Sequence, residues 1–196
     1  MRKIETLFIR DAKGRATREV NPGCEWVLAG EGVPTRKWDG TCCIVLGGKL
    51  FKRMDWKADK GPAPDVWIHH SRDPAQRSGH GWYPVGDGPE DWMHRKAWGQ
   101  QGADLSDVDN VTFELLGPCI GKNPEGMEPD EFLLRPHGGA IQDCERTYDG
   151  IRAFLEANPM EGIVWWRENG DLVKIKRRDF GLQWPVREAA KPQEKR

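Results

Sequence analysis

Residues 161–176 read EGIVWWRENGDLVKIK, and they constrain the fold more tightly than any other segment of the chain. β-branched and aromatic residues, which favour strands, fill positions 162–166 and 172–176. Asn169-Gly170 lies between these runs and is typical of a two-residue hairpin turn. The segment therefore predicts a pair of antiparallel strands.

A two-residue turn also predicts which side chains share a face of this hairpin. Glu168 would face Asp171, and counting outward would pair Trp165 with Lys174. One face would carry Glu161, Ile163, Trp165, Lys174, Lys176 and Arg178, and the core face would carry Val164, Trp166, Val173 and Ile175. A carboxylate beside several cations suits a metal-chelated phosphate. A solvated charged face is the alternative.

Length and charge limit the class of protein. The chain has 196 residues, which is enough for one sizeable core but not for two. Its 30 Lys and Arg nearly balance 31 Asp and Glu, so it lacks the overall basic charge typical of nucleic-acid binders, although a local basic groove remains compatible. We expect one folded domain over residues 1–186 and a charged, disordered tail over residues 187–196.

The remaining segments predict further elements. Residues 56–110 show no sustained periodicity, so we expect them to be irregular and either functional or partly mobile. Elsewhere we predict strands over 3–10, 24–29 and 110–116, a hairpin of 41–46 and 49–54 around Gly47-Gly48, and a short amphipathic helix around 151–155 that ends at Asn158-Pro159.

The amino end and the cysteines bear on the compartment. Charged residues interrupt the first ten positions, so no secretory signal is expected, and the apolar runs are too short to span a bilayer. We expect a cytoplasmic protein without a membrane partner. The 5 cysteines include no C-x-x-C spacing, which favours free, mostly buried thiols over a structural zinc site.

Lys37-Trp38-Asp39-Gly40 contains a candidate nucleophile. A lysine can form a phosphoramidate only when its amine is neutral, and partial burial beside other cations lowers a lysine pKa. Arg36 is adjacent in sequence, and Arg53 and Lys174 lie in hairpins that could approach it. The alternative is a surface lysine in a turn.

Four ordered segments resemble motifs I, III, IV and V of the covalent nucleotidyltransferases: residues 37–43 (KWDGTCC), 113–117 (FELLG), 161–165 (EGIVW) and 172–176 (LVKIK). That superfamily contains ATP-dependent DNA ligases, RNA ligases and messenger-RNA capping guanylyltransferases. Further segments are similar to the group that contains the human 5′-to-3′ RNA ligase and its small relatives, namely residues 121–124 (GKNP) with Gly126, 133–138 (LLRPHG) and 181–185 (GLQWP). The similarity runs from about residue 4 to Pro185.

The resemblance implies a fold and a set of site residues. The fold would be α+β, with antiparallel sheets enclosing a nucleotide cleft in a ligase-type nucleotidyltransferase (adenylation) domain. Lys37 would carry AMP as a lysyl adenylate, and Lys174 and Lys176 would bind the α-phosphate. Glu161 would bind the metal ion, and Glu114 would hold the ribose hydroxyls or help to place the metal.

Other matched positions receive weaker roles. Arg53 would contact the nucleotide or the RNA end, and a surface cation is its alternative. Asp39 would orient the segment that begins with the nucleophile, residues 37–40, which we call the lysine loop. No role follows for His137, and a buried, hydrogen-bonded histidine is favoured over a ligand at this position.

The implied activity is ATP-dependent RNA ligation, with Mg²⁺ or Mn²⁺ as the metal and with RNA 5′-phosphate and 3′-hydroxyl ends as the partners. AMP would pass from ATP to the lysine, then to the RNA 5′-phosphate, and the 3′-hydroxyl would expel it. The alternatives are DNA nick sealing, capping with GTP, or a non-catalytic module that binds RNA ends. A metal hydrolase built from His69, His70, His80 and His94 lacks a recognisable ligand spacing.

Tryptophans are frequent in the segment 56–110, including Trp67, Trp82, Trp92 and Trp98, with Tyr83 among them. Exposed aromatic rings could stack on unpaired bases. Buried structural tryptophans are the commoner arrangement.

Overall fold

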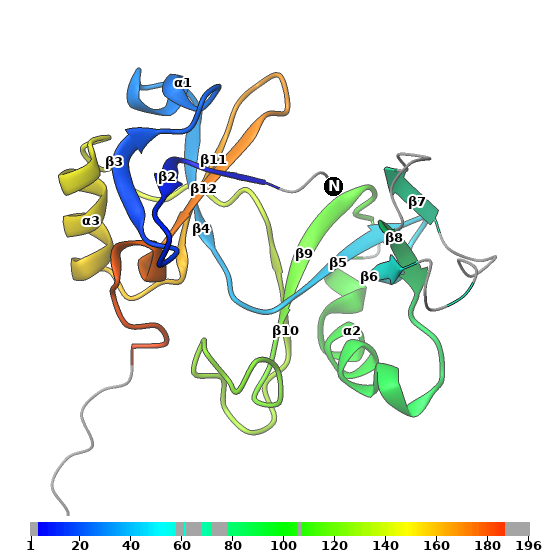
Figure 1. Cartoon of the computed structure of the whole chain (residues 1–196). Coiled ribbons are helices and arrows are strands. Elements are labelled where there is room, and N and C mark those ends of the chain that lie inside the picture. Colours follow the sequence, from blue (N-terminus) through cyan, green and yellow to red (C-terminus); the bar gives the residue numbers. More distant parts are fainter. Residues whose placement is uncertain (1–3, 58–60, 62–67, 72–77, 106, 187–196) are drawn as a thin grey trace, which may run out of the picture.

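The computed structural model describes residues 4–57, 61, 68–71, 78–105 and 107–186. Trp67 and the predicted tail over 187–196 lie outside the described residues, and so do the side chains of His69 and His70. The architecture is mixed α+β with largely antiparallel sheets and few helices (Figure 1). The sequence predicted this secondary-structure class correctly.

The hairpin at residues 161–176 lies at the centre of one sheet, which we call sheet A. Sheet A contains, in spatial order, β1 (Glu5–Thr6), β12 (Leu172–Lys176), β11 (Gly162–Trp166) and β4 (Val33–Lys37). β1 runs parallel to β12, and the other neighbours are antiparallel. A hairpin of β2 (Phe8–Arg10) and β3 (Ala16–Val20) lies beside this sheet (Figure 1).

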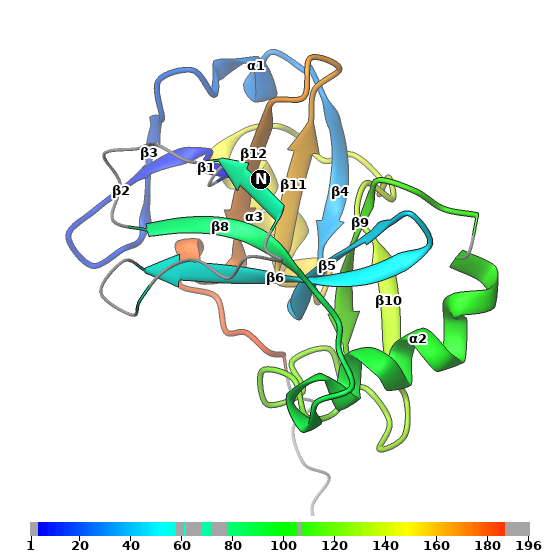
Figure 2. The same cartoon turned by 90° about the vertical axis from the view of Figure 1, so that its right-hand side faces the viewer.

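The other large sheet, sheet B, is antiparallel throughout. It contains, in order, β10 (Leu133–Pro136), β9 (Val111–Leu116), β5 (Thr41–Leu46), β6 (Lys49–Lys57), β8 (Ser78–Pro84) and β7 (Ile68–Ser71). The chain passes from sheet A to sheet B directly, from β4 into β5. Seen from the side, β6 and β8 run across β11 and β12 (Figure 2).

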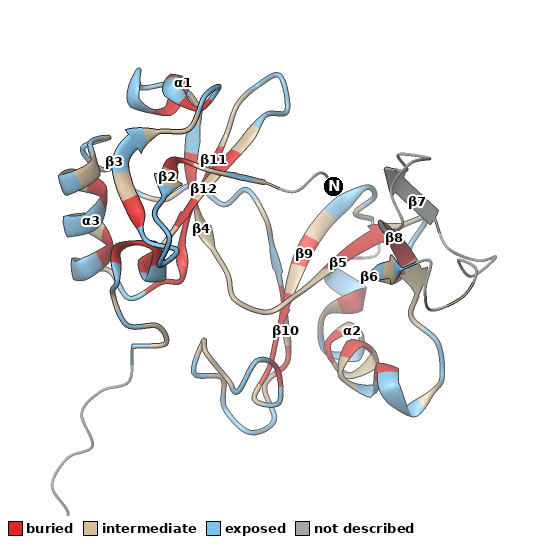
Figure 3. Ribbon diagram, in the orientation of Figure 1, coloured by how far each residue is buried: buried red, intermediate tan, exposed pale blue. Residues whose placement is uncertain are grey.

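Each sheet has its own hydrophobic core on the face that points away from the other sheet, so the expectation of a single core is wrong. α3 (Tyr148–Ala157) contributes Ile151 and Leu155 to the core of sheet A. α2 (Trp92–Leu105) contributes Ala97 to the core of sheet B. Figure 3 shows buried residues in the strands of both sheets and in α2 and α3. The inner faces are therefore free to carry polar groups.

Several predicted elements are confirmed. Leu46 pairs with Lys49 across Gly47-Gly48, as a two-residue turn requires. The strand predicted over 110–116 is β9, and the predicted helix is α3. The side chain of Thr147 caps that helix by accepting a hydrogen bond from the Gly150 amide at 3.0 Å.

The strand predicted over 24–29 is wrong, because residues Glu25–Leu28 form the short helix α1. The neighbours Trp26 and Val27 are both buried. Successive strand residues point to opposite faces, so a strand here would have to be covered on both sides. β3 (Ala16–Val20) was not predicted at all.

The irregular structure expected for 56–110 is also wrong in part. This segment contains β8, the 3₁₀ turn η2 (Pro89–Asp91) and the whole of α2. The buried residues of α2 are His94, Ala97 and Gly102, so it lacks the aliphatic stripe that reveals an amphipathic helix. Gly102 packs so closely under Trp98 that an added Cβ would lie 3.0 Å from its ring.

The predicted register of the central hairpin is wrong by one residue. The Arg167 amide donates to the Asp171 carbonyl at 3.0 Å, so the loop has three residues rather than two. Gly170 closes it at φ 88°, a conformation that favours glycine. Trp165 therefore pairs with Val173, and Val164 pairs with Lys174.

This shift exchanges the two faces of β11 but not those of β12. Ile163 and Trp165 are fully buried in the core, whereas Val164 and Trp166 face the other sheet. Lys174 and Lys176 still share a face with each other, because residues two apart on one strand point the same way.

The described tryptophans are mainly structural. Trp82 is 4% exposed, and Trp98 packs against the core of sheet B. Trp92 is 43% exposed, and its ring meets Phe132 edge-on at 5.3 Å between centroids. Across the described part of the chain, every helix is too short or too polar to cross a bilayer.

His94 makes folding dependent on pH. It lies buried on α2, and neither ring nitrogen has a hydrogen-bond partner among the described residues. Burial lowers the His94 pKa and outweighs the opposing effect of Asp91. The unfolded chain then binds this proton more readily, so the free energy of unfolding falls as the pH drops through the ordinary histidine range near about 6.5.

His94→Leu should reduce the loss of stability between about pH 7 and about pH 5, as measured by urea unfolding. The control His80→Gln replaces a histidine on β8 that is not buried, and it should keep the loss. An unchanged pH profile in His94→Leu would contradict this assignment.

Candidate active site

A cavity of about 240 Å³ lies between sheets A and B. Sheet A lines it with Thr35, Lys37, Val164, Trp166 and Lys174; Cys42, Arg53, Glu114 and His137 line it from the side of sheet B; and Trp38 closes part of the rim. Most of the predicted site residues therefore meet in one place, although they come from distant parts of the sequence.

Lys37 is the last residue of β4 and pairs with Gly162 on β11. A Cβ at Gly162 would lie 2.0 Å from the carbonyl oxygen of Ile175 on β12, so only glycine lets β11 and β12 approach each other this closely. Lys37 Nζ donates to Glu161 Oε2 at 2.5 Å and to the Trp38 carbonyl at 3.3 Å. The candidate nucleophile is thus held beside a carboxylate.

Glu161 precedes β11, and its carboxylate joins two amines. Its other oxygen accepts a hydrogen bond from Lys176 Nζ, while the residue itself is 5% exposed. A second pocket, of about 300 Å³, is lined among others by Asp39, Glu161, Lys176 and Arg178. The predicted gathering of Glu161 with Lys176 is therefore present, although the pairing used to predict it was wrong.

Lys174 lies beside these groups but does not form an ion pair with any carboxylate of the described residues. Burial, followed by the charges of Lys176, Lys37 and Arg10, lowers the Lys174 pKa to about 8. The surroundings of Lys174 in the folded protein therefore disfavour the charged form of its amine. The wall of the cavity is therefore electropositive and suited to an anion.

Glu114 links sheet B to the lysine loop. Its Oε1 accepts a hydrogen bond from the Gly40 amide at 3.1 Å, and its Oε2 lies 2.9 Å from His137 Nε2. A Cβ at Gly40 would lie 2.2 Å from the Leu115 carbonyl oxygen, which explains the glycine of the KWDG segment. Arg53 lines the same cavity, and its Nε lies 3.7 Å from Asp55 Oδ1.

Two further residues, Glu125 and Trp184, hold the lysine loop. The sequence assigned a role to neither of them, although Trp184 lies in the matched segment 181–185. Glu125 accepts hydrogen bonds from Arg36 at 2.6 Å and from the Asp39 amide at 2.9 Å, and its side chain is 3% exposed. Trp184 Nε1 donates to Asp39 Oδ2 at 2.8 Å. Burial raises the Glu125 pKa despite the neighbouring guanidinium.

The signal that could have found Glu125 was weak. It sits in a segment where Gly121, Lys122 and Asn123 all have positive φ, so the chain turns sharply. Such a turn predicts a loop with a defined conformation. It does not predict the loop's partner, Asp39, which lies 86 residues before Glu125.

The chain is similar in sequence to known proteins along most of its length. A family model described as RNA ligase 1 matches residues 98–194. RNA ligase 1 of Mus musculus is 26% identical over an alignment that covers 94% of this chain and 82% of the relative. For RNA ligase 1 of Pongo abelii the values are 26%, 79% and 69%, and for that of Danio rerio 25%, 94% and 82%.

This chain resembles RNA ligase 1. The resemblance predicted from the motifs is thereby confirmed. The range matched by the RNA ligase 1 family model includes Glu114, Glu161, Lys174 and Lys176, whereas Lys37 precedes it. The roles of the individual residues stay predictions.

Lys174→Met should increase the free energy of unfolding at pH 7 by about 1 kcal/mol, because it removes a half-buried cation that lies beside other cations. The gain should shrink as the pH rises from about 8 towards the ordinary lysine value, since the native lysine then loses its proton first. Urea unfolding at several pH values measures both effects.

Lys13→Met is the matched control, because Lys13 is exposed and should show neither effect. A destabilised Lys174→Met protein at pH 7 would refute this account of Lys174.

Proposed function

We propose that this chain is an ATP-dependent RNA ligase that joins 5′-phosphate and 3′-hydroxyl RNA ends through a lysyl-AMP on Lys37. Residues 1–186 would form a single nucleotidyltransferase domain. The observation that carries the proposal is the position of Lys37, which lines the cavity together with Lys174 and donates a hydrogen bond to Glu161. The names of the relatives favour RNA over DNA.

The electropositive wall suits the triphosphate of ATP. Lys174 and Lys176 lie on one face of β12, and the ammonium group of each would bind a phosphate oxygen of ATP. Their charges would stabilise the negative charge that develops on the α-phosphate during attack. Arg53, on the opposite sheet, would contact the nucleotide or the RNA end.

Glu114 would hold the ribose hydroxyls. Its carboxylate lies in the cavity and is fixed by the Gly40 amide on one oxygen. The ribose would then sit against sheet B while the phosphates face sheet A. With the ribose and the phosphates arranged in this way, the α-phosphate would lie near Lys37, at the end of β4.

Lys37 must lose a proton before it can attack phosphorus. Glu161 Oε2 lies 2.5 Å from Lys37 Nζ and is placed to accept that proton. Proton removal and phosphate binding would therefore depend on the same cluster.

Mg²⁺ or Mn²⁺ is the expected metal, and the donor set fits a hard cation. Glu161 and Asp39 line the second pocket with their carboxylates, beside Lys176. The ion, when bound, would neutralise charge on adjacent phosphates.

Lys37→Ala should abolish transfer of label from ATP radiolabelled on the α-phosphate to the protein, because no other residue would carry AMP. Lys13→Ala, which alters an exposed lysine, should label normally. Label on the Lys37→Ala protein would refute the assignment. The labelled native protein should seal 5′-phosphorylated RNA; sealing only of nicked DNA, or labelling only by GTP, would support the alternatives.

Glu125→Gln should slow self-adenylylation roughly 10-fold to 100-fold at saturating ATP, with a smaller change in KM for ATP. The reason is that Glu125 holds the lysine loop without lining the main cavity, so it acts as a positioning residue. Glu128→Gln alters an exposed carboxylate three residues away and should leave the rate unchanged.

A purely structural role for Glu125 would lower the thermal midpoint and leave the rate per folded molecule intact, which the labelling assay would reveal. Glu125→Asp retains the charge and should restore part of the rate.

A further inference from the structure

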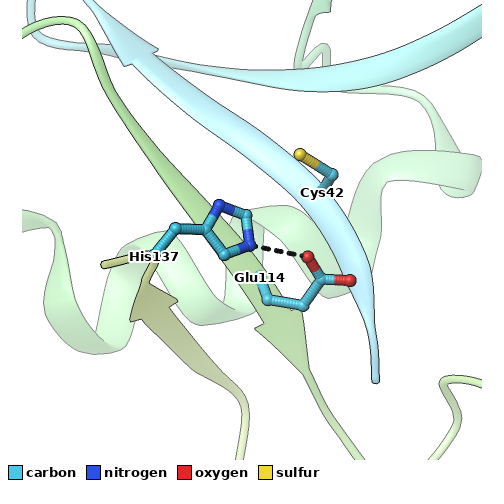
Figure 4. Close-up of side chains that lie close together, drawn as sticks. All are labelled: Cys42, Glu114 and His137. Atoms are coloured by element: carbon cyan, nitrogen blue, oxygen red, sulfur yellow. Dashed lines mark hydrogen bonds and ion pairs between the residues drawn. The ribbon is translucent and has the colours of Figure 1, made fainter. Parts of the chain in front are cut away.

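Three potential metal ligands converge on the cavity from sheet B. Cys42 lies on β5, Glu114 lies on β9 and His137 directly follows β10. Their ligand atoms all lie within 4.8 Å of one another (Figure 4). Cys42 and Glu114 are paired residues of adjacent strands, so the backbone ladder fixes their separation.

The orientation of His137 favours a ligand role. Its amide donates to the Thr112 carbonyl at 3.0 Å, and its Nδ1 lies 2.9 Å from Thr112 Oγ1. In the tautomer that carries its proton on Nδ1, that nitrogen donates a hydrogen bond to the Thr112 hydroxyl. Nε2 is then unprotonated, and its lone pair points towards Glu114 Oε2, 2.9 Å away. A cation between these two atoms would satisfy both, and the hydroxyl would hold the ring in place.

The donor set selects the type of metal. Sulfur, imidazole nitrogen and carboxylate oxygen together suit Zn²⁺, Co²⁺ or Cd²⁺ and are a poor set for Mg²⁺. This distinguishes the cluster from the all-oxygen site expected at Glu161. Burial and Glu114 raise the Cys42 pKa to about 12, so the thiol is protonated until a metal replaces the proton.

We propose that Cys42, Glu114 and His137 bind a thiophilic divalent cation such as Zn²⁺, and that the bound cation excludes ATP from the cavity. Cys42 exchanges its thiol proton for the metal and releases the proton to solvent. Three protein ligands leave a fourth position open towards the cavity.

The exclusion of ATP follows from shared space and shared atoms. All three ligands line the same cavity of about 240 Å³ as Lys37. Glu114 cannot hold the ribose hydroxyls while it ligates a metal. This part of the proposal rests on the proposed function, whereas metal binding itself does not.

Metal binding is tested on the metal-free full chain by titration with Co²⁺ and Cd²⁺, following the thiolate-to-metal charge-transfer absorption. The native protein should show a band that saturates at one equivalent. Cys42→Ser should lose it, whereas Cys119→Ser, which changes an exposed cysteine outside the cavity, should keep it. Thr112→Val should weaken binding roughly 10-fold, because the His137 ring loses the hydrogen bond between its Nδ1 and the Thr112 hydroxyl.

No band in the native protein, or an unchanged band in Cys42→Ser, would overturn the site. Circular dichroism on each variant verifies that a lost band does not reflect unfolding.

Exclusion of ATP is tested by self-adenylylation in excess Mg²⁺ with and without micromolar Zn²⁺, each variant being compared with its own zinc-free rate. Zinc should inhibit the native protein and Cys119→Ser, a chelator should restore the rate, and Cys42→Ser should resist inhibition. Equal inhibition of all three proteins would overturn the exclusion of ATP. Cys42-dependent absorption without self-adenylylation would refute the proposed function and keep the metal site.

Discussion

The Glu161 carboxylate is the charge on which the arrangement of the cavity depends. Strands β4 and β12 bring Lys37 and Lys176 to the same place, and the nearly buried Glu161 accepts hydrogen bonds from both amines. Lys174 has no such partner among the described residues, and burial, followed by the charges of its cationic neighbours, lowers its pKa to about 8. The carboxylate therefore offsets part of the repulsion among three neighbouring amines.

This cluster is possible because the hydrophobic cores lie elsewhere. Each sheet buries its apolar side chains on its outer face, under α3 in one case and α2 in the other. The alternation of strand residues then leaves Lys174 and Glu114 on the inner faces. Polar groups that would destabilise a single central core instead line a cavity between two cores.

The lysine loop gains its shape from distant contacts. Glu125 and Trp184 both bind Asp39, although they follow it by 86 and 145 residues. Glu114 holds Gly40 in addition. A loop fixed from three sides offers its neighbouring amine at a defined position, which chemistry on that amine requires.

Sequence pattern and composition by themselves determined much about this protein. Strand propensity and turn residues predicted the central hairpin, β5, β6, β9 and α3, and the order of the motifs indicated the resemblance to RNA ligases. These signals succeed because they are local: β-branched runs, Gly-Gly turns and an i, i+3, i+4 spacing act over a few residues.

Only the tertiary structure decided the register of the hairpin, the helix α2 and the contacts of Glu125. A three-residue loop and a two-residue loop differ by one residue around Asn169-Gly170, and burial of Trp165 in the core of sheet A accompanies the choice. The buried residues of α2 are His94, Ala97 and Gly102, which form no aliphatic stripe. In each case the deciding free energy comes from packing against residues far away in sequence, which a local pattern does not contain.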